Sequence, residues 1–145
     1  MVKNGIITGI GAIGSFVASL YGGWTSAMTT LCVFMLIDYI TGLICAGVFK
    51  KSSKTDDGGL ESKAGFKGPA RKFAILLHVL VACRIDVTLG TTYVRDTVII
   101  AFIANETISI VENIGLMGVP LPSVITKAIT LLNEKGGITE NGNGE

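Results

Sequence analysis

The residues most able to do chemistry in this sequence are ionisable side chains that stand inside long apolar stretches. They are Asp38 in the stretch 24–49, Arg84 and Asp86 in 73–93, and Glu106 and Glu112 in 97–118. A charge at the centre of a membrane helix costs about 2.5 to 3.5 kcal/mol on insertion scales, so each group needs a partner or water. Three interpretations are open. The groups form ion pairs within one subunit, such as Arg84 with Glu106 or Asp38, they line a water-filled lesion between subunits, or they relay protons or ions.

The stretch 97–118 carries its polar residues on one side. At about 100° per residue, five of them fall within an arc of roughly 120°, and isoleucine and valine occupy the rest. These five are Asn105, Glu106, Ser109, Glu112 and Asn113. Together with Asp38, Arg84 and Asp86, we expect them to be the intramembrane or pore-lining polar residues.

The sequence gives no sign of catalysis or of a bound cofactor. Glycine-rich phosphate loops, paired metal-ligand spacings and nucleophile elbows are absent, so we expect no enzyme, no cofactor and no metal site. His78 is the only histidine and has no second ligand nearby, which favours a packing or interfacial role. The three cysteines lie in apolar runs and show no CxxC spacing.

The composition is that of a membrane protein. Of the 145 residues, 49% are hydrophobic and 16% are charged, and the mean hydropathy is +0.61. Soluble domains have about 25% charged residues, so this chain has too few charges to coat an apolar core. The net charge of +1 excludes a large basic face, and we expect no nucleic acid partner.

Four stretches approach the roughly 20 apolar residues that a membrane-spanning helix needs: 5–21, 24–49, 73–93 and 97–118. The predicted fold is therefore an all-α integral membrane protein with four transmembrane helices, or three because Arg84 and Asp86 disfavour insertion of 73–93. An amphipathic helix is predicted over 120–135, either on the membrane interface or packed on protein. We expect one membrane domain, 1–135, and a disordered tail, 136–145.

The segment 50–72 is a predicted basic loop. It holds seven of the twelve basic residues: Lys50, Lys51, Lys54, Lys63, Lys67, Arg71 and Lys72. Lysine and arginine accumulate in short cytoplasmic loops, so this loop and both termini are predicted to be cytoplasmic. These residues either only determine topology or also bind anionic lipid.

Small residues recur at close spacing in the first apolar stretch. Gly5, Gly9, Gly11 and Gly14 would let helix backbones approach closely in lipid. The spacing predicts helix packing and leaves open whether the partner is another subunit or the same one.

One long segment has a specific pattern. Residues 103–122 read IANETISIVENIGLMGVPLP, and upstream lie Asp38-Tyr39-Ile40-Thr41-Gly42-Leu43, Ser52-Ser53, Lys67-Gly68 and the region 82–86. Over about residues 36–135 the chain resembles the phage lysis and clostridial toxin-secretion holin family.

The resemblance implies a protein that accumulates in the cytoplasmic membrane of a host bacterium and crosses it several times. It then assembles as a homo-oligomer and permeabilises the lipid bilayer. The lesion would release an endolysin without requiring direct contact with it, and in some relatives a toxin leaves by a similar route.

Two other functions are compatible with the sequence. Four spans with embedded acids also describe small proton-coupled transporters, although their essential acid is in the first helix and this chain has none there. A membrane anchor or assembly factor that uses the lysine-rich loop is the other alternative.

Overall fold

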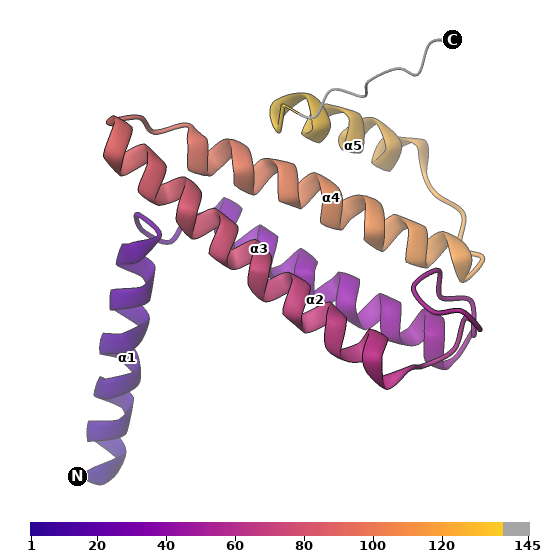
Figure 1. Ribbon diagram of the computed structural model, residues 1–145, viewed down its shortest axis with the longest axis horizontal. Coiled ribbons are helices and arrows are strands. Elements are labelled where there is room, and N and C mark those ends of the chain that lie inside the picture. The colour runs from indigo at the N-terminus through magenta and orange to yellow at the C-terminus, as the bar shows by residue number, and fades with distance from the viewer. Residues whose placement is uncertain (138–145) are drawn as a thin grey trace.

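The structure, a computed structural model, describes residues 1–137, which form five α-helices and no strand (Figure 1). In chain order these are α1 (Val2–Leu20), α2 (Ser26–Gly47), α3 (Ser62–Leu89), α4 (Val94–Leu116) and α5 (Ser123–Lys135). The all-α prediction is confirmed for this part of the chain. Of the tail predicted to be disordered, Gly136 and Gly137 are described, and 138–145 lie outside the described residues.

An apolar core lies between α2, α3 and α4. Leu31, Val79 and Ile99, one from each helix, have no exposed surface. The other buried members of the cluster are Met28, Met35, Ile75 and Ile103. α4 is the central element, because it contacts α2, α3 and α5 (Figure 1).

α2 and α4 run in the same direction, and α3 runs opposite to both (Figure 1). Near the start of α4, Arg95 Nη1 donates to the carbonyl oxygen of Tyr21, just before α2, at 2.7 Å. Toward the other end, Asn113 Nδ2 of α4 donates to Asp38 Oδ1 of α2 at 3.1 Å. The first turns of α2 and α4 therefore lie at the same end of the bundle. The chain returns from the end of α2 to the start of α4 through the 28 residues of α3, about 42 Å of helix.

The predicted loop 50–72 is shorter than expected, because α3 begins at Ser62 and continues through Pro69. Gly65, Gly68 and Pro69 disfavour helix by local propensity, but contacts with the rest of the bundle outweigh it. A Cβ atom at Gly68 would lie 3.3 Å from the ring of Tyr39. The glycine thus allows α3 to approach α2 closely.

Within the described residues, two helices are long and apolar enough to cross a membrane, α2 and α4, with hydropathies of 1.9 and 1.4. They correspond to the predicted spans 24–49 and 97–118. The predicted spans 5–21 and 73–93 do not meet this criterion, so two of the four are supported by length and composition. Two features disfavour these spans. α3 has basic residues in its first turns, and α1 is only 19 residues long and includes the polar residues Lys3 and Asn4.

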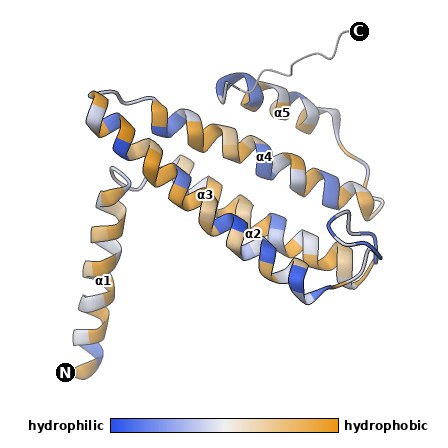
Figure 2. Cartoon of the chain, in the orientation of Figure 1, coloured by the Kyte–Doolittle hydropathy of each residue, from blue (hydrophilic) through white to orange (hydrophobic). Residues whose placement is uncertain are grey.

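Large apolar side chains are exposed on the outer surfaces of α1, α2 and the second half of α3. Exposed side chains include Ile10 and Phe16 of α1, Leu36 and Ile40 of α2, and Val81 of α3. Figure 2 shows apolar residues along α1 and α2 to α4, and hydrophilic residues gathered in the segment between α2 and α3. This distribution is the one expected for helices solvated by lipid.

The first and last helices differ in how they join the bundle. α1 has no buried residue and extends away from the other helices (Figure 1). Its Gly5, Gly9, Gly11 and Gly14 have nothing within 4 Å of an added Cβ atom, so they mediate no packing with the rest of residues 1–137. α5 lies along α4, and its Leu132 packs on the core cluster, which matches the predicted alternative of a helix packed on protein.

We predict that Gly68→Val lowers the free energy of unfolding by about 1 to 3 kcal/mol more than Gly65→Val does, because overpacking costs that much. Both changes place the same side chain in α3, but a Cβ at Gly65 meets nothing within 4 Å. Unfolding in detergent micelles, followed by circular dichroism, measures the difference. Equal destabilisation by the two variants would contradict the close contact with Tyr39.

Candidate functional site

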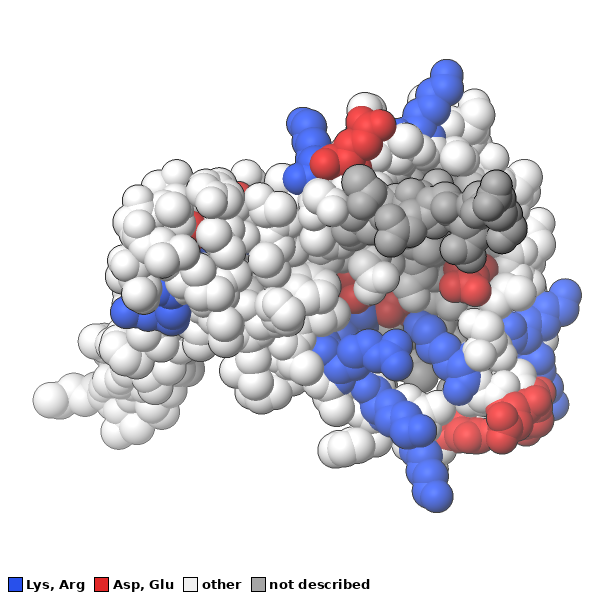
Figure 3. Space-filling model, turned by 45° about the horizontal axis from the view of Figure 1, so that its top comes forward, with Lys and Arg blue, Asp and Glu red and all other residues white. Residues whose placement is uncertain are grey.

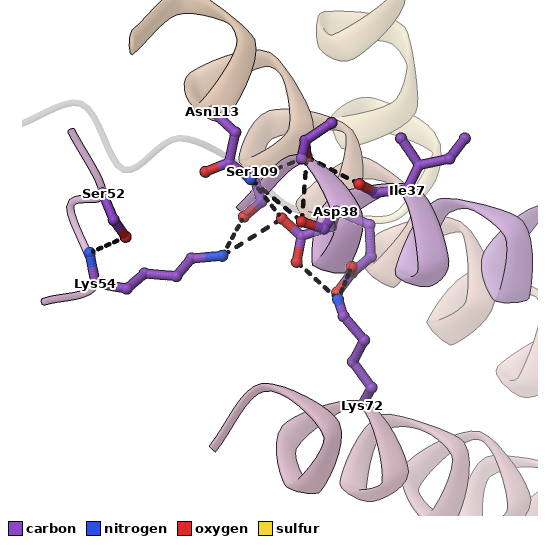
Figure 4. A network of polar contacts seen from close by, with 9 residues as sticks. Ile37, Asp38, Ser52, Lys54, Lys72, Ser109 and Asn113 are labelled. Atoms are coloured by element: carbon purple, nitrogen blue, oxygen red, sulfur yellow. Dashed lines mark hydrogen bonds and ion pairs between the residues drawn. The ribbon is translucent and has the colours of Figure 1, made fainter. Parts of the chain in front are cut away.

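Three ionised side chains from three helices meet inside the bundle (Figure 4). Lys72 Nζ of α3 lies 2.7 Å from Asp38 Oδ2 of α2 and 2.5 Å from Glu106 Oε2 of α4. Asp38 is 6% exposed and Glu106 is 3% exposed. One ammonium group therefore bridges two buried carboxylates.

A second layer of contacts surrounds Asp38. Lys54, from the segment between α2 and α3, places Nζ 3.4 Å from Asp38 Oδ1 and 3.4 Å from Ser109 Oγ. Asn113 Nδ2 donates to Asp38 Oδ1 and, at 3.2 Å, to Thr41 Oγ1. Figure 4 shows Lys54, Lys72 and Asn113 converging on Asp38 from different segments. We call Asp38, Lys54, Lys72, Glu106, Ser109 and Asn113 the buried ion network.

The charges of this network balance, with two carboxylates and two ammonium groups. Such compensation is required in a low-dielectric interior, where an unpaired charge costs several kcal/mol. The network also fixes the relative positions of α2, α3 and α4, since each contributes a charged member.

The ion-pair partners of Asp38 and Glu106 differ from the partner suggested by the sequence, which was Arg84. Asp38 and Glu106 pair with Lys72, and Asp38 also with Lys54, whereas Arg84 is exposed and forms no ion pair within the described residues. Sequence reasoning assigned both lysines to the basic loop, as determinants of topology or as sites for anionic lipid, and did not pair them with the acids. The available signal was the position of Lys72, directly before the apolar stretch 73–93, where its long side chain can reach along the bundle.

The polar side of α4 is divided by the packing. Glu106 and Asn113 are buried, and Ser109 is half-buried at the edge. Asn105 and Glu112, which lie together at one margin of the predicted arc, are exposed. The packing thus buries the side of this face that carries Glu106 and Asn113, and leaves the opposite margin outside the buried ion network.

Asp86 has a separate structural role at the opposite end of the bundle. Its Oδ1 accepts from Thr91 Oγ1 at 2.5 Å and from the Val94 amide at 3.1 Å, and its Oδ2 accepts from the Arg95 amide at 2.8 Å. The carboxylate therefore satisfies free amides at the start of α4, where the helix dipole favours negative charge. Sequence reasoning grouped Asp86 with the intramembrane polar residues and missed this cap.

Most of the basic residues predicted to determine topology remain on the surface. Lys50, Lys51, Lys63, Lys67 and Arg71 are exposed and make no ion pair in the described part of the chain. Figure 3 shows lysine and arginine side chains gathered at the end of the molecule that holds the segment between α2 and α3.

Residues 1–137 contain no cluster of three or more potential metal ligands. The ring of His78 packs edge-to-face on Phe102, with ring centroids 5.4 Å apart. The site is therefore a set of ion pairs and hydrogen bonds between helices, and the chemistry it offers is charge compensation.

Comparison with known proteins identifies the family of the chain. The family profile described as the bacteriophage holin family matches residues 15–134, which include every residue of the buried ion network. The chain belongs to the bacteriophage holin family. Membership indicates a phage-lysis role and association with the membrane, and the family is not one of enzymes.

This holin-family chain has relatives that match it over most of their length. An uncharacterised protein of Listeria monocytogenes is 40% identical, with 97% of this chain and 92% of the relative covered. An uncharacterised protein of Clostridium perfringens is 37% identical, with 92% and 97% covered. A probable holin of Bacillus phage phi105 is 33% identical and covers 76% of each chain. No solved structure matches the chain.

We predict that Lys72→Met lowers the free energy of unfolding of this holin-family chain by about 3 to 5 kcal/mol, because it leaves two carboxylates buried without their cation. Adding Asp38→Asn and Glu106→Gln to that variant should recover most of the loss. Unfolding in a neutral detergent, followed by circular dichroism, is the measurement.

Lys51→Met is the matched control for Lys72→Met. Lys51 belongs to the same basic group but is exposed, so its replacement should change stability by less than about 0.5 kcal/mol. Similar stabilities of the two single variants would remove Lys72 from its bridging role.

Proposed function

We propose that the chain is a holin that assembles into homo-oligomers in the bacterial cytoplasmic membrane and forms lesions through which an endolysin reaches the cell wall. The observation that carries the proposal is a network of ionised groups enclosed by helices that expose many large apolar side chains. Membership of the holin family supports the same role.

The buried ion network suggests how the same chain is harmless as a single subunit and lytic after assembly. In the single subunit, Lys72 compensates Asp38 and Glu106, so the buried charges present nothing to lipid. When subunits assemble and α3 moves away from α2 and α4, water would solvate the same groups at little cost. The side of α4 that carries Glu106, Ser109 and Asn113 would then line the lesion, with Asn105 and Glu112 at its margins.

The directions of the helices favour a larger number of membrane spans than the two that composition alone indicates. If α2 and α4 both cross the membrane in the same direction, α3 has to cross between them. Pairing of Asp86 with the start of α4, and of Lys72 with two acids, reduces the cost of carrying charges on α3. We therefore propose that α3 is a span although its composition is mixed.

α1 completes the proposed topology as a fourth span. It has no charged residue after Lys3, it leaves its glycines uncovered, and the short turn 21–25 joins it to α2. With the basic segment between α2 and α3 in the cytoplasm, four spans place both termini there too. The open glycines of α1 would then serve association between subunits.

The topology predicts where a membrane-impermeant thiol reagent reacts in intact cells. With Cys32, Cys45 and Cys83 replaced by alanine, a cysteine at exposed Thr92, between α3 and α4, should be labelled from outside. A cysteine at exposed Ser53, between α2 and α3, should be labelled only after the cells are permeabilised.

Labelling before lesion formation is essential, so the assay uses low expression and verifies an intact membrane potential. The same side for positions 92 and 53 would contradict a crossing by α3. Labelling of Ser53→Cys from outside would reverse the orientation.

Induction of the chain in bacteria should collapse the membrane potential abruptly and let a co-expressed cytoplasmic endolysin lyse the cells. Glu106→Gln and Glu112→Gln should each change the time of collapse by about a factor of two or more, if removing one charge alters the solvation of the lesion by about 0.5 kcal/mol. A potential-sensitive dye and culture turbidity follow both events.

Glu134→Gln, in the last turn of α5 and exposed, is the matched control and should keep the original timing. Continued growth with an intact potential after induction would refute the lytic function. Unchanged timing in both the Glu106 and the Glu112 variant would refute their place in the lesion.

A further inference from the structure

A cavity of about 160 Å³ lies beside the buried ion network. It is bounded by the second half of α2, the segment that follows it, the first turns of α3 and the middle of α4. The apolar part of its wall comprises Tyr39, Leu43, Ala46, Leu60 and Ala64. The basic side chains that line it are Lys54, Lys67, Arg71 and Lys72.

Two of these basic side chains are available for a ligand. Lys54 and Lys72 are engaged with Asp38 and Glu106, which form the buried side of the cavity. Lys67 and Arg71 are exposed, form no ion pair in the described part of the chain, and stand one helical turn apart on α3. Because the acids inside are already compensated, these two charges attract an anion despite exposed Glu61 at the rim.

The start of α3 adds to this attraction. No acidic residue lies in its first turn, and the side chain of Glu61 at the N-cap makes no capping hydrogen bond. The first backbone amides of α3 are therefore without a side-chain cap, and the positive end of the helix dipole lies there. Ala64 and Gly65 of this turn line the cavity together with Lys67 and Arg71.

The apolar wall distinguishes among anions. Leu43 lines the cavity and is 38% exposed on the outer surface of α2, beside exposed Ile40 and Ile44. Leu43 thus connects the cavity with the apolar outer surface of α2. A free phosphate would leave this surface in contact with water, whereas an amphiphile would cover it.

We propose that the cavity binds the phosphate group of an anionic phospholipid of the leaflet that faces the basic segment. Arg71 donates to two phosphate oxygens with its planar guanidinium group, and Lys67 adds a second charge. Leu43 and Tyr39 contact the glycerol and the first acyl carbons. The proposal rests on the cytoplasmic placement of this end of the bundle, but not on lesion formation.

The test measures binding to the purified full chain in a neutral detergent. Short-chain phosphatidylglycerol should raise the melting temperature in a saturable way, and phosphatidylcholine and sodium phosphate should do so at least about tenfold more weakly, because they lack the net charge or the chains. The variant K67Q/R71Q should weaken phosphatidylglycerol binding by about tenfold or more, as expected for two basic groups near a membrane surface.

The matched control is K51Q/K63Q, which removes two exposed charges from the same basic group but none that lines the cavity. It should keep binding within about threefold of the original chain. Equal weakening by both variants would overturn the proposal, since the attraction would then belong to the basic surface as a whole.

Sodium phosphate or phosphatidylcholine binding as tightly as phosphatidylglycerol would overturn the assignment to an anionic lipid. Lytic activity is recorded separately, so loss of lysis with intact binding counts only against the lytic function.

Discussion

The fold depends on one ammonium group that serves two buried carboxylates. Asp38 and Glu106 each lie twelve residues beyond the first residue of their helix, so the parallel packing of α2 and α4 brings two negative charges to the same height. In a low-dielectric interior these charges repel strongly. Lys72 resolves the conflict only if α3 runs beside both helices at the correct register. The position of α3 is therefore set by electrostatics as much as by the apolar core.

Lys72 also stands at the junction between two different halves of α3. Before it, residues 62–72 carry basic side chains and pack beside the hydrophilic segment that follows α2. After it, residues 73–89 contribute Ile75 and Val79 to the core and expose Leu77 and Val81. One helix thus extends from an aqueous boundary into apolar surroundings, and the buried ion pair marks the change. This division explains why α3 does not resemble a membrane span by composition, although the proposed topology needs a crossing between α2 and α4.

Sequence patterns predicted the helices and the acids but not their partners. The apolar stretches located α2 and α4, and the polar arc located Glu106 and Asn113, because both depend on periodicity that the chain displays directly. The helical turns before Lys72 escaped prediction because Gly65, Gly68 and Pro69 are turn residues by propensity, and only the contact with Tyr39 reveals why α3 continues. Pairing with Lys72 could not be inferred either, because it depends on a register between helices that no local pattern specifies.

Two neighbouring residues connect the surface of the bundle with its interior. Arg71 lines the cavity and is exposed, whereas Lys72 points between α2 and α4 and is half-buried. A rigid helix cannot move one of them without the other, so an anion that holds Arg71 also holds Lys72 against Asp38 and Glu106. Under the proposed lipid site, headgroup binding and charge compensation stabilise the same position of α3. Release of α3 during assembly would then require both to be lost, which couples lesion opening to the lipid around the subunit.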